Sequence, residues 1–372
     1  MDTPSPTTSL SLAVKALLAT MLVCFGLMVS VSEPFLSTWL AMFFIALVPA
    51  QILTSIWEDN GVAQRFFPDS QPHKGLARIA FTLLVALIVT LLVFATVGGM
   101  SHYPKPPMMH YLIVTVVFSF WFVIVWNGWP LNFGQGRLAR GHYSALAFLG
   151  ICFGVAYLLF AGLFNFAFLQ GSALYVAELD PQGAFNAWYS VSFLVTTVAV
   201  LFSLVLLEFR PVTSLATPAQ GLRWGLLNSA LILAVSAAIF GLATQVFELD
   251  PVLYLVHGPV SFIFGVFVPL NLCEGRLFGR LSGYRRGMML ILVAAISGLI
   301  LNRLYFAIAS YMTDNLSSGA PGYDLELWVA NAMLAFSFPV LVMITEHLQF
   351  WPLRRPASPV SAPPQTAPKS LA

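Results

Sequence analysis

The feature that most limits how this chain can fold is a series of ten long, uninterrupted apolar runs. They cover approximately residues 10–31, 35–57, 76–97, 109–126, 143–169, 185–207, 222–246, 252–268, 288–312 and 325–345. A bilayer core about 30 Å thick needs about 20 apolar residues as helix, and lipid leaves the backbone no other hydrogen-bond partner. The runs lack the alternation of membrane β-strands. We therefore predict an all-α, polytopic transmembrane bundle of about ten helices.

The composition also indicates that the partner of this chain is the lipid bilayer. Apolar residues make up 59% of the 372 residues and charged residues only 9%, whereas about 25% is usual in soluble domains. A net charge of +2 without a basic stripe predicts no nucleic-acid partner. The three cysteines have no C-x-x-C spacing, which predicts small buried side chains rather than disulfides or metal ligands.

Basic residues are concentrated in alternate connections between the runs. The other connections hold Lys105 and most of the acidic residues, namely Glu33, Glu178, Asp180, Glu248, Asp250, Asp314, Asp324 and Glu326. Connections rich in Lys and Arg stay in the cytoplasm, so we predict a multi-pass protein of the plasma or inner membrane with both termini cytoplasmic. An alternative stays open, because Lys15 and Ser30-Val31-Ser32 also fit a signal peptide. Its cleavage would leave nine helices and an external N-terminus.

The tails differ in composition from the rest of the chain. Residues 354–372 are rich in Pro, Ala and Ser with almost no large apolar residues, and residues 1–9 are similar. Such segments cannot bury enough apolar surface to offset the entropy of ordering. We expect disordered tails at 1–9 and 354–372 around a transmembrane domain at 10–353.

Self-similarity is the most specific pattern in the chain. Pro130-Leu131-Asn132 followed by Gly136-Arg137-Leu138 recurs as Pro269-Leu270-Asn271 followed by Gly275-Arg276-Leu277. At about the same offset, Trp188 matches Trp328 and Pro211 matches Pro352. We predict a tandem repeat of two four-helix units at about 68–211 and 211–352. Both copies would have the same orientation, because each holds an even number of helices.

A shorter theme predicts that the chain is built from five helical hairpins. An aromatic residue just before a proline marks the end of every even-numbered run, at Phe67, Trp129, Phe209, Phe267 and Trp351, and a glycine often precedes the next run. Aromatic residues favour the headgroup level, proline ends a helix and glycine permits a tight re-entry. We expect these aromatic side chains at the membrane surface.

Three polar residues inside the runs are candidate substrate-binding residues: Arg303, Asn302 and His257. A cation inside the membrane usually faces protein or a wet cavity, so Arg303 could hold an anionic solute or pair with Glu248 or Asp250. The alternative is that its long side chain reaches the interface. His257 could titrate near neutral pH or could simply be a packing histidine. His110 and His142 flank connections and add no motif.

Three prolines inside runs are candidate kink or gate positions: Pro49, Pro259 and Pro339. Proline kinks a helix because it removes one hydrogen bond and clashes with the preceding turn. Kinked helices can line a cavity. Proline is also common in membrane helices generally, so an ordinary structural role stays open.

The basic side carries a group of titratable side chains at helix ends: Glu58, Glu208, Glu346 and His347. If they converge, they could bind a metal or relay protons. The alternative is interfacial ion pairs with Arg210 or Arg354. There is no H-E-x-x-H motif, no nucleotide-binding loop and no paired histidines for haem, so we predict no metal and no cofactor.

Three functions are compatible with these patterns. The first is a secondary transporter or permease for a small or amphiphilic solute, which predicts a cavity near the membrane midplane that Arg303 and His257 approach. The second is a membrane-embedded enzyme that acts on a lipid or isoprenoid, which requires the four basic-side groups to meet around a pocket. The third is a non-catalytic scaffold or assembly factor, which needs neither a cavity nor a converging site.

Overall fold

The computed structural model describes residues 6–59, 67, 70–99, 101–131, 142–172, 174–313, 316–320 and 322–354. The first helix, α1, begins at Pro6, so helix extends into the segment predicted to be an N-terminal tail. Residues 1–5 and 355–372 lie outside the described part, and so do most positions of the Pro130 copy of the repeat motif.

Within the described residues, ten helical segments are long and apolar enough to cross a membrane, and the chain is a multi-pass membrane protein. The five odd-numbered segments are span 1, Leu10–Ser30 (in α1, Pro6–Ser30); span 3, His73–Thr96 (α4); span 5, Ala145–Leu163 (in α6, His142–Leu163); span 7, Leu222–Val246 (α9, Leu222–Gly241; η8, Leu242–Val246); and span 9, Gly283–Met312 (α12).

The five even-numbered segments are more often divided into consecutive helical elements. They are span 2, Glu33–Trp57 (α2, Glu33–Phe35; η1, Leu36–Leu40; α3, Ala41–Asp59); span 4, Pro106–Val125 (α5, Pro106–Phe120; η3, Trp121–Val125); span 6, Ala187–Leu206 (α7); span 8, Pro251–Leu272 (α10, Pro251–Leu255; η9, Val256–Val260; α11, Ser261–Phe267; η10, Val268–Leu272); and span 10, Asp324–His347 (α13, Asp324–Ala330; η11, Asn331–Ser337; α14, Phe338–Val342; η12, Met343–His347).

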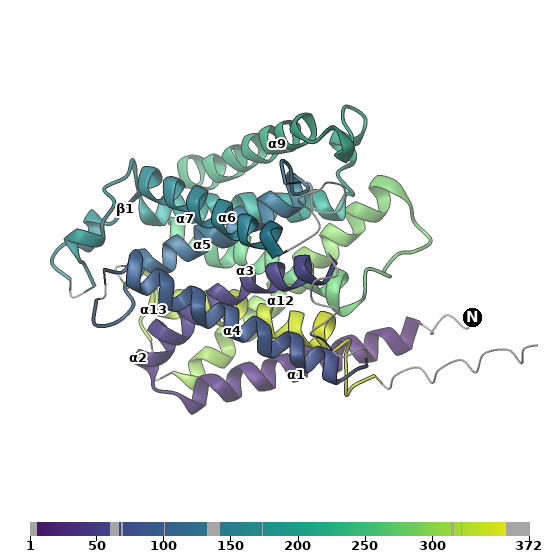
Figure 1. The fold of residues 1–372 in the computed structure, drawn as a ribbon, viewed down its shortest axis with the longest axis horizontal. Helices are drawn as coiled ribbons and strands as arrows, with labels where there is room; N and C mark the ends of the chain where they lie inside the picture. The colour runs from purple at the N-terminus through teal and green to yellow at the C-terminus, as the bar shows by residue number, and fades with distance from the viewer. Residues whose placement is uncertain are drawn as a thin grey trace, which may run out of the picture.

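Short elements occupy the connections. They are β1 (Phe164–Asn165), η5 (Ala167–Leu169), η6 (Ala177–Leu179), β2 (Phe185–Asn186), α8 (Arg210–Thr213) and η7 (Pro218–Gln220). The two strands pair in parallel and draw together the ends of the connection between spans 5 and 6. Figure 1 shows the helices lying side by side, with α9 along one side of the bundle and α1 along the other.

The ten spans form two concentric layers. The even-numbered spans are 56–72% buried and the odd-numbered spans only 22–39% buried. Each even-numbered span contacts the next one along the chain, and span 10 contacts span 2, so the inner layer is a closed ring of five helices. Each odd-numbered span packs outside this ring, against neighbouring inner spans: span 3 on spans 2 and 10, span 5 on 4 and 2, span 7 on 6 and 4, span 9 on 8, 10 and 6, and span 1 on 10 and 8.

The regular ring is a feature of how the spans pack. It does not test the duplication of four-helix units in the sequence, which stays a prediction.

One contact between an inner and an outer helix is especially close. A Cβ added to Gly298 of span 9 would lie 2.3 Å from Ser261 O of span 8, and one added to Gly265 would lie 2.0 Å from Ala294 O. Small residues let membrane helices approach this closely because they leave the backbones uncovered.

The two ends of the bundle carry opposite charge. We call one the basic end; its described cations are Lys74, Arg78, Arg210, Arg223, Arg276, Arg280, Arg285, Arg286 and Arg354. The other is the acidic end, with Glu33, Glu178, Asp180, Glu248, Asp250, Asp324 and Glu326 together with Lys105. The acidic end includes β1 and α2, which lie together at one end of the bundle in Figure 1.

Candidate functional site

The structure brings His257 and Asn302 together but turns Arg303 away. His257 Nδ1 lies 3.1 Å from Asn302 Oδ1, and the imidazole stacks on Phe306 with ring centroids 4.9 Å apart. Asn302 is buried and also donates to Val256 O at 3.3 Å. Arg303 follows it by one position, about 100° around the helix, and is exposed. None of the three predicted residues lines the cavity described below, and their binding of a solute stays a prediction.

Asp250 does not pair with Arg303, because both of its carboxylate oxygens have other partners. Oδ1 accepts hydrogen bonds from the amides of Val252 and Leu253 at 2.9 and 3.0 Å, which caps α10. Oδ2 accepts the hydroxyl of Tyr323 at 2.5 Å. Burial and the nearby Asp250 carboxylate raise the pKa of Tyr323 to about 12. Asp250 therefore connects span 8 to the connection before span 10.

The three candidate kink prolines all belong to the inner ring. Pro49 lies inside α3 and Pro259 inside the π-helical turn η9, while Pro339 is the second residue of α14, which follows the π-helical segment η11. Gln51 is buried and donates through Nε2 to Pro339 O at 2.8 Å, which connects spans 2 and 10 across the ring contact. A hydrogen bond between membrane helices contributes about 0.6–2 kcal/mol. A gating role for these prolines stays a proposal.

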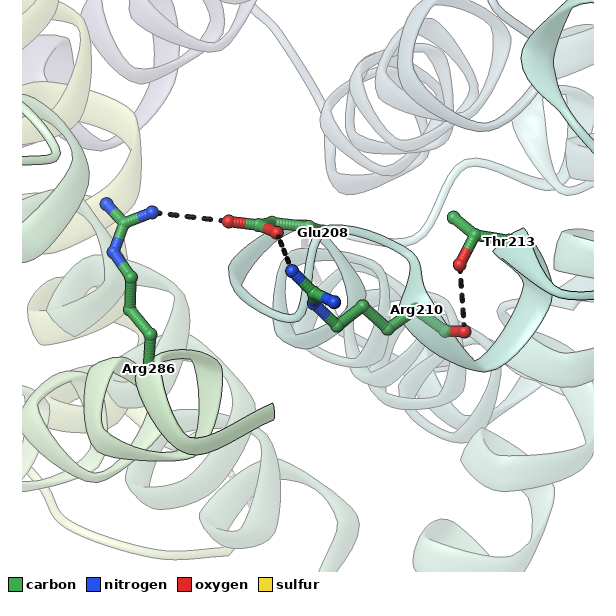
Figure 2. A network of polar contacts seen from close by, with 4 residues as sticks. All are labelled: Glu208, Arg210, Thr213 and Arg286. Carbon is green, nitrogen blue, oxygen red and sulfur yellow. Dashed lines mark hydrogen bonds and ion pairs between the residues drawn. The ribbon is translucent and has the colours of Figure 1, made fainter. Parts of the chain in front are cut away.

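The carboxylate of Glu208 at the basic end is used in ion pairs. Glu208 Oε2 lies 2.8 Å from Arg210 Nη2, and its Oε1 lies 3.2 Å from Arg286 Nη1 of span 9. Figure 2 shows the carboxylate between the two guanidinium groups. The interfacial pair between Glu208 and Arg210 that the sequence left as an alternative is thus confirmed.

The other predicted basic-end groups have different surroundings. Glu346 Oε1 accepts a hydrogen bond from Asn271 Nδ2 at 3.0 Å. His347 is buried, and neither ring nitrogen has a hydrogen-bond partner in the described part of the structure. The side chain of Glu58 lies outside the described residues. Among the described residues, no group of three or more His, Cys, Asp or Glu side chains is arranged to hold a metal ion.

A cavity of about 490 Å³ lies inside the inner ring, in the half of the bundle nearer the acidic end. All five inner spans line it, through Val48, Val117, Val198, Ile263 and Leu334 among others, and parts of the acidic-end connections complete the wall. The volume lies within the range of about 300–1,000 Å³ typical of small-molecule sites. The wall is mostly apolar and aromatic, so an apolar molecule would replace water favourably there.

Side-chain hydrogen bonds hold the acidic-end connections that form part of this wall. Asp180 is buried and accepts hydrogen bonds from the amides of Phe166 and Gln182 at 3.1 and 3.0 Å. Glu326 is also buried and accepts the hydroxyl of Ser318 at 2.5 Å. These carboxylates therefore order the connections around the cavity.

His110 is the most enclosed polar group in the cavity wall. It is 7% exposed, and its Nδ1 lies 2.8 Å from Pro106 O. The ring has edge contacts with Phe164, Phe166 and Trp188, at centroid distances of 5.8, 5.2 and 5.4 Å. Its Nε2 is buried and has no hydrogen-bond partner among the described residues.

Four phenylalanines close the axis of the ring on the basic side of the cavity. We call Phe120, Phe202, Phe267 and Phe338 the phenylalanine cluster; they come from spans 4, 6, 8 and 10. Successive centroid distances are 5.4 Å from Phe120 to Phe202, 5.5 Å to Phe267, 4.2 Å to Phe338 and 6.3 Å back to Phe120. Phe338 also lines the cavity, so the cluster forms its floor.

Two residues of this site have roles that the sequence reading did not assign. The expectation that Phe267 faces the headgroups is wrong: it is 5% exposed and stacks on Phe338. Its span continues through η10 to Leu272, which places Phe267 well inside the ring. His110 carries no sequence signal, because a single histidine near the start of an apolar run is common.

Comparison with known protein families, with curated proteins and with solved structures gave no match to this chain. Its function therefore has to be argued from the ring, the cavity and the phenylalanine cluster.

Proposed function

We propose that this protein is a permease or secondary transporter for a small amphiphilic solute, which enters the cavity from the acidic end and passes along the axis of the inner ring. The observation that carries the proposal is the ring of five helices around a cavity whose floor is the phenylalanine cluster. A scaffold needs no such axial space. Basic connections favour the cytoplasm, so the cavity would face the extracytoplasmic side.

The charges at the cavity favour a neutral or cationic solute. Glu33 and Asp324 line the cavity, whereas no Lys or Arg does so among its described lining residues. Lys105 lies between two lining prolines but directs its ammonium group to Tyr103, with Nζ 2.6 Å from the hydroxyl oxygen. Aromatic faces such as that of Trp188 also attract cations.

The enzyme hypothesis has weaker support. It requires Glu58, Glu208, Glu346 and His347 to meet around a pocket at the basic end, and of these the side chain of Glu58 lies outside the described residues. Glu208 instead pairs with two arginines, and Glu346 bonds to Asn271. No described contact joins these carboxylates.

The phenylalanine cluster provides the test. We would reconstitute the protein in liposomes and measure uptake of two permanently charged probes, radiolabelled phenyltrimethylammonium and benzenesulfonate. Replacing both Phe267 and Phe338 by Ala removes three of the four aromatic contacts of the cluster, of about 0.5–1.5 kcal/mol each. We expect uptake of phenyltrimethylammonium to rise about tenfold or more above wild type, with benzenesulfonate affected less.

The matched control is Phe247→Ala, because Phe247 is 70% exposed at the end of an outer span. It should leave uptake at the wild-type rate. If neither wild type nor the Phe267→Ala/Phe338→Ala variant takes up either probe faster than protein-free liposomes, the proposed function is wrong.

A further inference from the structure

Asn331 is the polar side chain that lies deepest in the described cavity wall. It follows Asp324 by seven positions on span 10, which is about 10 Å along the helix and nearly the same helix face. The other polar side chains of the wall all belong to the beginning of a span, nearer the mouth; they are Glu33, Ser37, Thr38, His110, Trp188, Asp324 and Trp328. Beyond Asn331, the lining residues of span 10 are Leu334, Ala335, Phe336 and Phe338.

The carboxamide of Asn331 also differs from the buried carboxamides of the spans. Gln51 donates to Pro339 O at 2.8 Å, Asn228 to Trp224 O at 2.9 Å and Asn302 to Val256 O at 3.3 Å. Asn331 makes no side-chain hydrogen bond with any described residue. It is only partly buried, and neither its oxygen nor its nitrogen is among the enclosed polar atoms that lack a partner. Both atoms are therefore accessible from the cavity that the residue lines.

The polar groups nearer the mouth have other surroundings or other chemistry. Glu33 and Asp324 begin spans 2 and 10, so their carboxylates lie at the mouth and suit a cationic group there. The hydroxyl of Thr38 donates to Pro34 O at 2.5 Å. Nε2 of His110 is enclosed, so a molecule in the cavity does not reach it. Indole N–H groups of the tryptophans can only donate, whereas a carboxamide both donates and accepts.

We propose that Asn331 is a specificity-determining residue of the cavity, which hydrogen-bonds a hydroxyl group on the inner part of an amphiphilic solute whose cationic group stays at the mouth. The inference rests on the proposed function and names the chemical class of the solute. A hydroxyl group both donates and accepts, as the carboxamide does. A methyl group in its place would cover the carboxamide without satisfying it, so the cavity distinguishes the two.

The test compares two probes of nearly equal shape, 6-hydroxy-2-naphthyltrimethylammonium and 6-methyl-2-naphthyltrimethylammonium. Each has the ammonium group at one end of the ring system and the hydroxyl or methyl group at the other. Equilibrium dialysis against detergent-purified protein would give the two Kd values. A net hydrogen bond contributes about 1 kcal/mol, so the preference for the hydroxy probe should be about fivefold larger in wild type than in Asn331→Leu.

Gln245→Leu is the matched control, because it removes an exposed carboxamide of outer span 7 that does not line the cavity. It should keep the wild-type preference. An equal preference in wild type and Asn331→Leu would overturn the role of Asn331 and leave the proposed function standing. Failure of both probes to bind wild type would overturn the cavity as a solute site, and the proposed function with it.

A second measurement does not depend on the folding of Asn331→Leu. In wild-type protein labelled with ¹⁵N-asparagine, the hydroxy probe should shift one side-chain amide resonance further than the methyl probe does. The two ring systems are the same, so the difference reports the hydrogen bond to the carboxamide. Equal shifts from both probes would overturn that hydrogen bond.

Discussion

The inner and outer spans are similar in hydropathy but differ sharply in their surroundings. Mean hydropathy is 1.8–2.2 for the inner spans and 2.0–2.8 for the outer spans, yet the inner spans are about twice as buried. Outer leucines face lipid, and inner side chains face one another or the cavity. Apolar character therefore places a helix in the membrane, whereas packing decides whether that helix belongs to the inner ring or to the outer layer. Three changes would test this division.

The largest effect is expected where an inner and an outer helix approach most closely. In Gly298→Ala the new Cβ would lie 2.3 Å from Ser261 O, which belongs to the backbone and cannot move without shifting span 8. We expect a loss of about 3 kcal/mol or more, seen as loss of the monodisperse peak in size-exclusion chromatography.

Gly241→Ala is the control for that change, because a Cβ at Gly241 would meet nothing within 4 Å. Alanine favours helix over glycine by up to about 1 kcal/mol, so this variant should be as stable as wild type or slightly more stable. Equal behaviour of the two variants would contradict the close contact between spans 8 and 9.

A leucine pair tests the two layers directly. Leu112 of span 4 is 0% exposed, and Leu158 of span 5 is 70% exposed. We expect Leu112→Ala to cost about 2–4 kcal/mol because it leaves a cavity in the packed ring. Leu158→Ala should cost less than about 0.5 kcal/mol. SDS-induced unfolding of the detergent-solubilised variants measures both, and a similar cost at the two positions would argue against an inner and an outer layer.

The smallest effect concerns an ion pair that joins two inner spans at the basic end. Glu274 Oε1, after span 8, lies 2.6 Å from Arg354 Nη1, after span 10. The hydrogen bond from Arg354 holds the pKa of Glu274 below its usual value. Exposed pairs contribute about 0.2–1 kcal/mol, so Glu274→Gln should lower the melting temperature only slightly at pH 7.

The pH dependence of that difference follows from the direction of the pKa shift. A lowered pKa means that the contribution is complete above the pKa of a free glutamate, about 4.3, and is lost as the pH falls through the lower folded value. The gap in melting temperature between wild type and Glu274→Gln should therefore shrink below about pH 4. A gap that stays constant down to pH 3 would show that Glu274 acts through packing rather than charge.

The sequence predicted most of the helices and part of the site. Ten apolar runs correspond to the ten spans, and the prolines at 49, 259 and 339 all belong to inner spans. Arg303 was a candidate binding residue because of its charge. It lies on the exposed face of its helix, one position after the buried Asn302. The surrounding helices decide which face of a helix is buried. In an apolar run, no change in residue type marks that face.

The sequence by itself determined that the backbone must be helical and must cross the membrane repeatedly, because lipid satisfies no backbone hydrogen bond and each run is long enough to span it. Tertiary structure alone decided that alternate helices close into a ring and that four phenylalanines from distant runs meet below a cavity. It also placed His110 in the cavity wall, with a buried Nε2 that has no hydrogen-bond partner among the described residues. These features depend on contacts between residues far apart in the chain, and hydrophobicity is much the same in every run that supplies them.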